Sequence, residues 1–158
     1  SPDGRGTVFR MGLPTFHGAE RDGEGSPPEP RAEPARLLVV DDEVAVLAGL
    51  YRMLRREHVV TLAQDAGEAL AALARERFDA ILLDLMMPDV TGIELFERLS
   101  RERPEVAERV IFMTGGAFTE EARLFVTGHE EHTLRKPFDR PELRRMLQRR
   151  MRLWPVAR

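Results

Sequence analysis

Five short apolar runs, each followed by a stretch with other periodicity, constrain the fold of this sequence more than any other feature. We predict strands at residues 37–40, 59–63, 78–84, 109–114 and 132–136. The stronger runs are apolar at almost every position, which is typical of parallel strands covered on both faces. Helices between the strands would supply the crossover connections that parallel pairing needs. The pattern therefore predicts an α/β fold with a doubly wound parallel sheet.

The segments between these runs contain helix signals. After the first run, one helical stripe is expected to contain Leu47, Leu50, Tyr51 and Leu54. Later helices are predicted to begin at four capping residues: Asp65, which has a capping-box glutamate at Glu68, and Thr91, Thr119 and Asp139. Pro104 is expected in the connection after the third helix, because proline interrupts a helix.

The chain divides by composition into four parts. Residues 15–35 are rich in Pro, Gly and Glu and have no apolar period, so they are predicted to be a flexible linker. Residues 36–152 contain all the predicted strands and helices, and 153–158 are expected to be a short tail. Residues 1–14 precede the linker and are considered separately below.

Composition excludes several classes of function. The net charge of −3 gives no bulk attraction to nucleic acid, and the absence of cysteine rules out disulfides and thiolate metal sites. No apolar run approaches the roughly 20 residues of a membrane span. We expect a cytoplasmic protein with no nucleic-acid partner and no membrane contact.

Polar residues gather at the carboxyl ends of the predicted strands. These residues are Asp41, Asp42, Asp84, Thr114 and Lys136, the only lysine in the chain. In a doubly wound sheet such ends form the ligand-binding edge, so the three carboxylates should lie close together and repel one another. An all-oxygen ligand set favours a hard cation such as Mg²⁺. The hydroxyl and the ammonium suit phosphoryl oxygens.

Each of these residues also has an ordinary structural explanation. Asp84 could be a turn former, and Asp41 and Asp42 could cap the first helix. Thr114 could simply end a strand, and Lys136 could be a solvated charge. Their coincidence at four strand ends favours a site that handles a phosphoryl group with Mg²⁺.

Four motifs resemble the receiver domain of two-component response regulators. They are "VVDDE" (39–43), "LLDLMMPDVTG" (82–92), "MTGG" (113–116) and "KPF" (136–138). They occur in the family's order and on the expected elements. The resemblance implies a flavodoxin-like sheet with strand order 2-1-3-4-5.

The resemblance also implies a metal site. Asp42 and Asp84 would bind Mg²⁺ directly, together with the backbone carbonyl of Met86. Asp41 would act on the same ion through water. Asp84 would accept a phosphoryl group from the phosphohistidine of a kinase.

Two further residues would act on that phosphoryl group. The resemblance implies that Thr114 bonds a phosphoryl oxygen and that Lys136 pairs first with Asp84 and then with the phosphoryl group. It also implies a cis peptide bond between Lys136 and Pro137. The chain departs from the family at Thr133, where receivers usually have an aromatic switch residue, so coupling to an output surface through that ring is in doubt.

The first fourteen residues, "SPDGRGTVFRMGLP", resemble the closing segment of the ATP-binding domain of histidine kinases. The alternative is an unstructured lead-in. The first interpretation predicts the receiver domain of a hybrid sensor histidine kinase, whose catalytic part is not in this sequence. The receiver would catalyse its own phosphorylation and dephosphorylation. Its partner would be the dimerisation and phosphotransfer domain upstream in the same polypeptide, with a downstream phosphotransfer protein as a further possibility.

Four other functions deserve comparison with the sequence. One is a stand-alone, single-domain response regulator that acts by protein–protein interaction, and it stays open. A DNA-binding regulator is disfavoured, because the segment after Pro137 is too short for a DNA-binding domain. A P-loop nucleotidase would need a Gly-Lys-Ser/Thr motif, and the sole lysine precedes Pro137. Another type of Mg²⁺-dependent phosphatase would have an aspartate where Met86 stands.

Overall fold

A five-stranded parallel sheet forms the centre of the molecule in the computed structural model, which describes residues 34–116 and 119–153. The strands are β1 (Arg36–Val40), β2 (Val59–Ala63), β3 (Ala80–Asp84), β4 (Val110–Thr114) and β5 (Thr133–Arg135). Their order is β2-β1-β3-β4-β5, and every neighbouring pair is parallel. The predicted fold class and strand order are confirmed.

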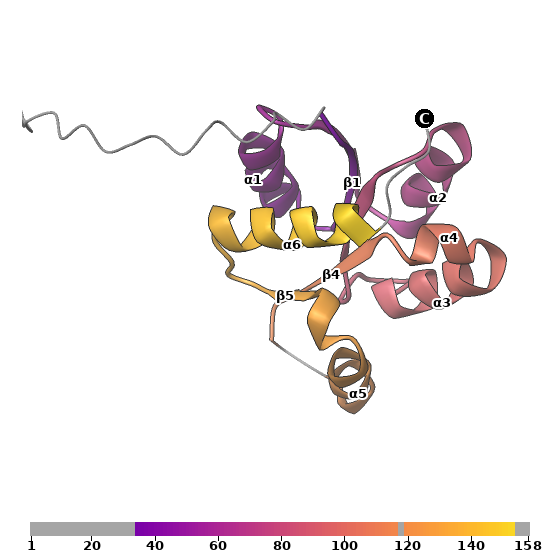
Figure 1. Cartoon of the computed structure of the whole chain (residues 1–158). Helices are drawn as coiled ribbons and strands as arrows, with labels where there is room; N and C mark the ends of the chain where they lie inside the picture. Colours follow the sequence, from indigo (N-terminus) through magenta and orange to yellow (C-terminus); the bar gives the residue numbers. More distant parts are fainter. Residues whose placement is uncertain (1–33, 117–118, 154–158) are drawn as a thin grey trace, which may run out of the picture. The chain divides into compact units, whose positions relative to one another are not determined.

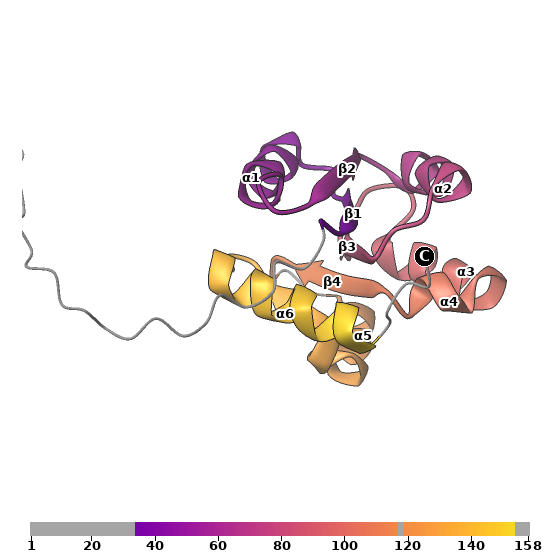
Figure 2. The ribbon, with the colours of Figure 1, turned by 45° about the horizontal axis from the view of Figure 1, so that its top comes forward.

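Helices cover both faces of this sheet (Figures 1 and 2). They are α1 (Val44–Leu54), α2 (Ala66–Arg75), α3 (Gly92–Glu102), α4 (Pro104–Ala107), α5 (Glu120–Gly128), the 3-10 helix η1 (Glu130–His132) and α6 (Arg140–Leu153). Leucines of α1 and α6 pack in one apolar cluster, whereas α2, α3 and α5 contribute to the other. Helix α6 ends at Leu153, which is the first residue of the predicted tail 153–158.

The two apolar clusters explain why the strands are apolar at consecutive positions. Along β1, Leu38 and Val40 belong to one cluster, while Leu37 and Val39 belong to the other. Every residue of β3 and of β4 is buried. Side chains of a strand point alternately to its two faces, so a strand covered on both faces must be apolar throughout.

The predicted capping residues begin their helices. Asp65 accepts a hydrogen bond from the backbone N–H of Glu68 at 2.8 Å, and Thr119 accepts one from Ala122 at 3.2 Å. The capping box predicted at Asp65 is not reciprocal, because the Glu68 carboxylate accepts from Gln64 instead. Thr91 and Glu94 form a complete, reciprocal capping box at the start of α3.

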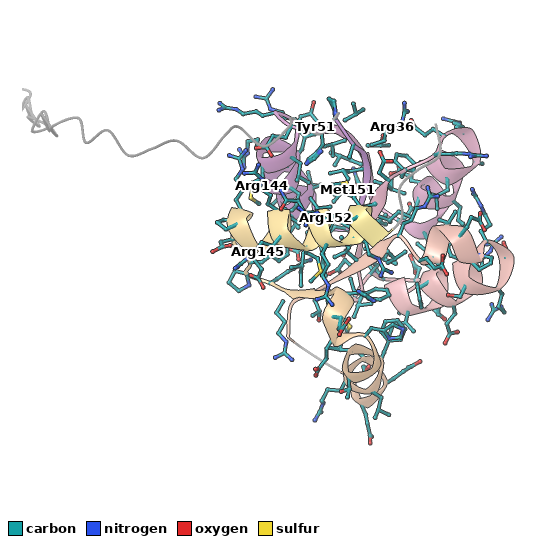
Figure 3. The ribbon with its side chains drawn as sticks, in the orientation of Figure 1. Arg36, Tyr51, Arg144, Arg145, Met151 and Arg152 are labelled. Atoms are coloured by element: carbon teal, nitrogen blue, oxygen red, sulfur yellow. The ribbon has the colours of Figure 1, made fainter. Side chains whose placement is uncertain are left out.

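Two predictions about the helices are wrong. Tyr51 lies on α1 but is 42% exposed rather than packed with the leucine stripe (labelled in Figure 3). The guanidinium carbon of Arg55 lies 6.0 Å from its ring centroid, and the phenol can keep its hydroxyl in water there. Pro104 does not lie in a connection but begins α4, because the first position of a helix needs no N–H donor.

Several predictions fall outside the described residues. Residues 1–14, and the linker 15–35 apart from its last two residues, lie outside them, as do tail residues 154–158. Among the helices that are described, none has the length and apolar character to cross a membrane.

Candidate functional site

The strand order brings four of the predicted site residues to one edge of the sheet. Asp41 directly follows β1, Asp84 ends β3, Thr114 ends β4 and Lys136 directly follows β5. Asp41, Asp84 and Thr114 are 0%, 4% and 1% exposed, and they are the only buried polar or charged residues in the described part of the chain. Because burying polar groups is costly, their concentration at one edge marks it as a functional site.

The ammonium of Lys136 joins two of the carboxylates. Its Nζ lies 2.6 Å from Oδ2 of Asp41 and 2.8 Å from Oδ1 of Asp84. The backbone N–H of Lys136 donates to the carbonyl of Thr114 at 2.7 Å, which fixes the lysine beside the end of β4. The peptide bond between Lys136 and Pro137 is cis, as the resemblance to receiver domains implied.

The turn after β3 holds Asp84 in place. Its Oδ2 accepts a hydrogen bond from the backbone N–H of Met86 at 3.1 Å. Asp89, in the same turn, has a positive φ of 62°, a conformation that Asp tolerates better than most residues. Gly92 approaches so closely that a Cβ on it would stand 2.0 Å from the carbonyl oxygen of Asp84. Glycine is therefore required at residue 92 by the backbone of the site.

The three aspartates are close enough to share a cation. Asp41, Asp42 and Asp84 each offer a carboxylate oxygen, and these oxygens lie within 4.8 Å of one another. Asp41 is held by a hydrogen bond from the N–H of Glu43 to its Oδ1 at 3.0 Å, while Asp42 is exposed. Three carboxylates against one ammonium leave negative charge, so this oxygen donor set fits a hard divalent ion such as Mg²⁺.

The charges of the site shift the pKa of two groups. Burial raises the pKa of Asp84, and the negative charge of Asp41 acts in the same direction, against the opposing effect of Lys136. Burial by itself would lower the pKa of Lys136, but its hydrogen bonds to Asp41 and Asp84 outweigh burial and the pKa is raised. The lysine is therefore firmly protonated, whereas the negative charge on Asp84 is disfavoured.

Thr114 completes the buried edge. Its Oγ1 is buried and has no hydrogen-bond partner among the described residues. A buried hydroxyl without a partner is costly. Such a group at the end of β4 can bind an oxygen that arrives with a ligand.

Thr133 stands at the position of the usual switch aromatic and makes a hydrogen bond there instead. The hydroxyl of Thr133 donates to the backbone carbonyl of His129 at 2.9 Å. His129 stacks on Phe125, with ring centroids 4.3 Å apart, and also meets the rings of Phe96 and Phe112 edge-on. The sequence analysis missed this cluster, because residues from three separate elements and the turn after α5 form it and no local pattern connects them.

Comparison with known proteins identifies the family. Residues 37–148 match the response regulator receiver domain, and these residues contain every predicted site position. The chain belongs to the response regulator receiver family. The predicted receiver, residues 36–152, contains the whole matched range, and the fold described above is the family's CheY-like fold.

Relatives of this receiver include both regulators and a kinase. The transcriptional regulatory protein TcrA of Mycobacterium tuberculosis is 36% identical over 130 residues, which cover 81% of this chain and 50% of TcrA. The sensor histidine kinase AruS of Pseudomonas aeruginosa is 30% identical over 151 residues, which cover 91% of this chain and 14% of AruS. The chain thus spans half or less of these curated relatives.

One solved structure is informative about the metal. The receiver domain of the sensor histidine kinase PA1611 from Pseudomonas aeruginosa is 29% identical, with a TM-score of 0.65, and the match covers 75% of this chain and 98% of that one. That receiver has a magnesium ion coordinated in its active-site cleft.

Proposed function

We propose that this receiver accepts a phosphoryl group on Asp84 from the phosphohistidine of a histidine kinase. A carboxylate oxygen of Asp84 attacks phosphorus, the bond from phosphorus to the imidazole nitrogen breaks, and the imidazole leaves with the bonding electron pair. One observation carries this proposal: Asp84 is a buried carboxylate at the end of β3, next to Lys136, in a chain of the receiver family.

The aspartates would hold the metal that this transfer needs. We assign Asp42, Asp84 and the carbonyl of Met86 as direct Mg²⁺ ligands, with Asp41 acting through water. When bound, Mg²⁺ supplies positive charge that offsets the negative charge of the carboxylates and of the phosphoryl oxygens. The oxygen cluster described above supports this assignment.

Thr114 and Lys136 would bind the phosphoryl group after transfer. The Thr114 hydroxyl is buried without a partner in the described part of the chain, so a phosphoryl oxygen would give it an acceptor. Lys136 already contacts Asp84 at 2.8 Å, and its ammonium would pair with the added negative charge. Both residues therefore act after the carboxylate has been modified.

The first candidate for the parent protein is a hybrid sensor histidine kinase. The likeness to AruS over 91% of this chain supports it, as does the resemblance of residues 1–14 to the end of a kinase ATP-binding domain. The donor would be the dimerisation and phosphotransfer domain of the same cytoplasmic polypeptide, and a separate phosphotransfer protein would be a possible acceptor. The second candidate is a stand-alone response regulator that acts by protein interaction. The likeness to TcrA, a transcriptional regulatory protein, supports a response regulator as the parent but not this mode of action.

The acceptor assignment is tested by phosphorylation with acetyl phosphate and Mg²⁺, followed by intact mass measurement. Wild-type protein and Asp89→Asn, a control in the same turn, should gain one phosphate. Asp84→Asn should gain none, because an acyl phosphate forms only on a carboxylate. Stable phosphorylation of Asp84→Asn would refute the assignment.

The metal assignment is tested separately by calorimetric titration with Mg²⁺. Asp42→Ala should bind the ion markedly more weakly, since it removes a hard ligand. Glu43→Ala is the matched control, because the Glu43 side chain caps no helix N–H and lies one residue away. Equal affinities of the two variants would mean that Asp42 is not a ligand.

The parent protein is tested by the upstream coding sequence. A hybrid kinase requires an ATP-binding domain and a helical hairpin with a phosphorylatable histidine before residue 1. An unrelated coding sequence there would exclude the kinase candidate and leave the regulator.

A further inference from the structure

A cavity of about 150 Å³ lies at the end of the sheet opposite to the aspartates. It is lined by the end of α2, the residues before β3 and β4, and the turn that contains α4. Ile81, near the start of β3, contributes to its wall, whereas Asp84 ends the same strand. Three residues of a strand span roughly 10 Å, so the cavity is separate from the phosphoacceptor site.

The inner wall of this cavity is apolar. Leu73, Phe78, Ile81 and Val106 line it, and all four are buried. A cavity of about 150 Å³ in total has room for a group of the size of one benzene ring. The inner wall therefore suits a compact apolar group of the size of a single ring.

The remaining wall is charged, with more positive than negative groups. Arg77, Arg103 and Arg109 line it together with Glu76 and Glu105. Both glutamates already form ion pairs with arginines. Glu76 forms an ion pair with Arg36 (labelled in Figure 3) and accepts from the hydroxyl of Thr61 at 3.3 Å.

Glu105 lies 3.7 Å from the Nε of Arg103. Arg77 and Arg109, in contrast, have no carboxylate within 4.0 Å among residues 34–116 and 119–153. The cavity wall therefore has positive charge that the described acidic residues do not neutralise.

Two of these arginines are fixed by hydrogen bonds. Nη1 of Arg109 donates to the carbonyl of Phe78 at 2.7 Å, and Nη1 of Arg103 donates to the carbonyl of Leu73 at 2.9 Å. The Nε of Arg109 is buried and has no acceptor in the described residues. A guanidinium held in this way presents donors that match the two oxygens of a carboxylate.

We propose that this cavity is a binding site for a small aromatic monocarboxylate, with the ring on the apolar wall and the carboxylate on Arg109. The ring accounts for the size and character of the inner wall. The carboxylate pairs with the guanidinium of Arg109 and offsets the positive charge of the outer wall. An inorganic anion would leave the apolar wall against water, so charge alone does not explain the site.

Benzoate is the probe that tests this proposal, with backbone amide NMR of the full chain as the readout. Benzoate should cause saturable shifts of the amides of residues 73–81 and 103–109, and leave those of Asp41 and Asp84 unchanged. Benzamide, the neutral analogue, should bind at least about tenfold more weakly, because it loses the charged hydrogen bond. Phosphate should not displace benzoate.

Variants locate the carboxylate. Arg109→Met should weaken benzoate binding about tenfold or more, whereas Arg101→Met, on the exposed side of α3, should leave it unchanged. Arg77→Met, at an exposed position, should weaken benzoate binding by a smaller factor. It is the substitute test variant if Arg109→Met does not fold.

Three results would overturn the proposal. The first is the absence of saturable shifts with benzoate up to tens of millimolar. The second is equal binding of benzoate and benzamide, or displacement of benzoate by phosphate, in the wild-type protein. The third is unchanged benzoate affinity in a folded Arg109→Met protein.

Discussion

The two ends of the central strands β3 and β4 contrast in how they treat polar groups. At the carboxyl ends, Asp84 and Thr114 are buried with Asp41, and one ammonium serves two carboxylates. At the amino ends, Arg103 and Arg109 donate to backbone carbonyls of neighbouring segments. The first end brings repelling carboxylates together, while at the second end the arginines satisfy backbone acceptors, although Nε of Arg109 has no partner among the described residues.

This contrast shows that polar groups at the two ends affect the stability of the fold in opposite directions. The charges at the carboxyl ends are arranged for a ligand that brings positive charge and new acceptors, so without that ligand they destabilise the fold. The arginines at the amino ends connect loops to the sheet and stabilise it. Substitutions at the two ends should therefore change the free energy of unfolding in different ways.

The largest effect is expected for Lys136→Met. It leaves the buried carboxylates of Asp41 and Asp84 without their shared cation, and breaking a buried ion pair from one side costs about 3 kcal/mol or more. Urea unfolding at neutral pH in the presence of a chelator measures the loss. Arg135→Met is the control, since Arg135 is exposed on the neighbouring position of β5. Similar losses in both variants would mean that Lys136 does not hold the two carboxylates together.

Gly92→Ala should cost about 2 kcal/mol, because its Cβ would overlap the carbonyl oxygen of Asp84 and the backbone would have to move. It should also slow phosphorylation by acetyl phosphate, because the turn that holds Asp84 shifts. Gly49→Ala on α1, where nothing lies within 4 Å of the added Cβ, should instead stabilise the protein by about 0.5–1 kcal/mol. A neutral Gly92→Ala would show that the turn adapts without strain.

At the opposite end, Arg109→Met should cost about 1.5 kcal/mol. It removes a charged hydrogen bond of 2.7 Å and leaves the Phe78 carbonyl without that donor. Thermal or urea unfolding provides the measurement. Arg101→Met, whose arginine is exposed and lies 4.0 Å from Glu97, should be nearly neutral. If Arg109→Met were more stable than wild type, the hydrogen bond from Arg109 to Phe78 would not stabilise the fold, and the two ends would not differ as described.

Most of the fold was predictable from the sequence, because it depends on patterns that repeat locally. The runs 37–40 and 59–63 became strands almost at the predicted boundaries, and four capping residues marked helix starts. The errors occurred where a pattern allows two outcomes. A helical position next to the leucine stripe can be buried or exposed, as with Tyr51, and a proline can interrupt a helix or begin one, as with Pro104.

The site was predictable for a different reason. Parallel strands place their carboxyl ends at one edge, so Asp41, Asp84, Thr114 and Lys136 could be grouped before any distance was known. The sequence could not show that Lys136 contacts two carboxylates at once, or that Thr114 has no partner among the described residues. These facts depend on side-chain positions, as does the contact of His129 with three phenylalanines.

The smallest effect, of opposite sign, is expected for Asp84→Asn in the absence of Mg²⁺. The pKa of Asp84 is raised, chiefly by burial, so the folded protein binds the carboxyl proton more tightly than the unfolded chain does. The unfolding free energy therefore falls as pH rises from the ordinary carboxyl pKa through the raised pKa of Asp84, and it stays lower above both.

Asparagine resembles the protonated, uncharged carboxyl group, so Asp84→Asn should escape this loss. We expect the variant to be more stable than wild type at neutral pH, by less than Arg109→Met loses. The gain should disappear in acid, where Asp84 is protonated in the folded and the unfolded protein. Chemical unfolding at a series of pH values with a chelator present measures the difference. Asp89→Asn, at an exposed aspartate of the same turn, is the control variant. If Asp84→Asn were less stable than wild type at neutral pH, the contact of Lys136 with Asp84 would outweigh the cost of burial. The charges at the carboxyl end of β3 would then stabilise the fold, as the hydrogen-bonded arginines at the amino end do.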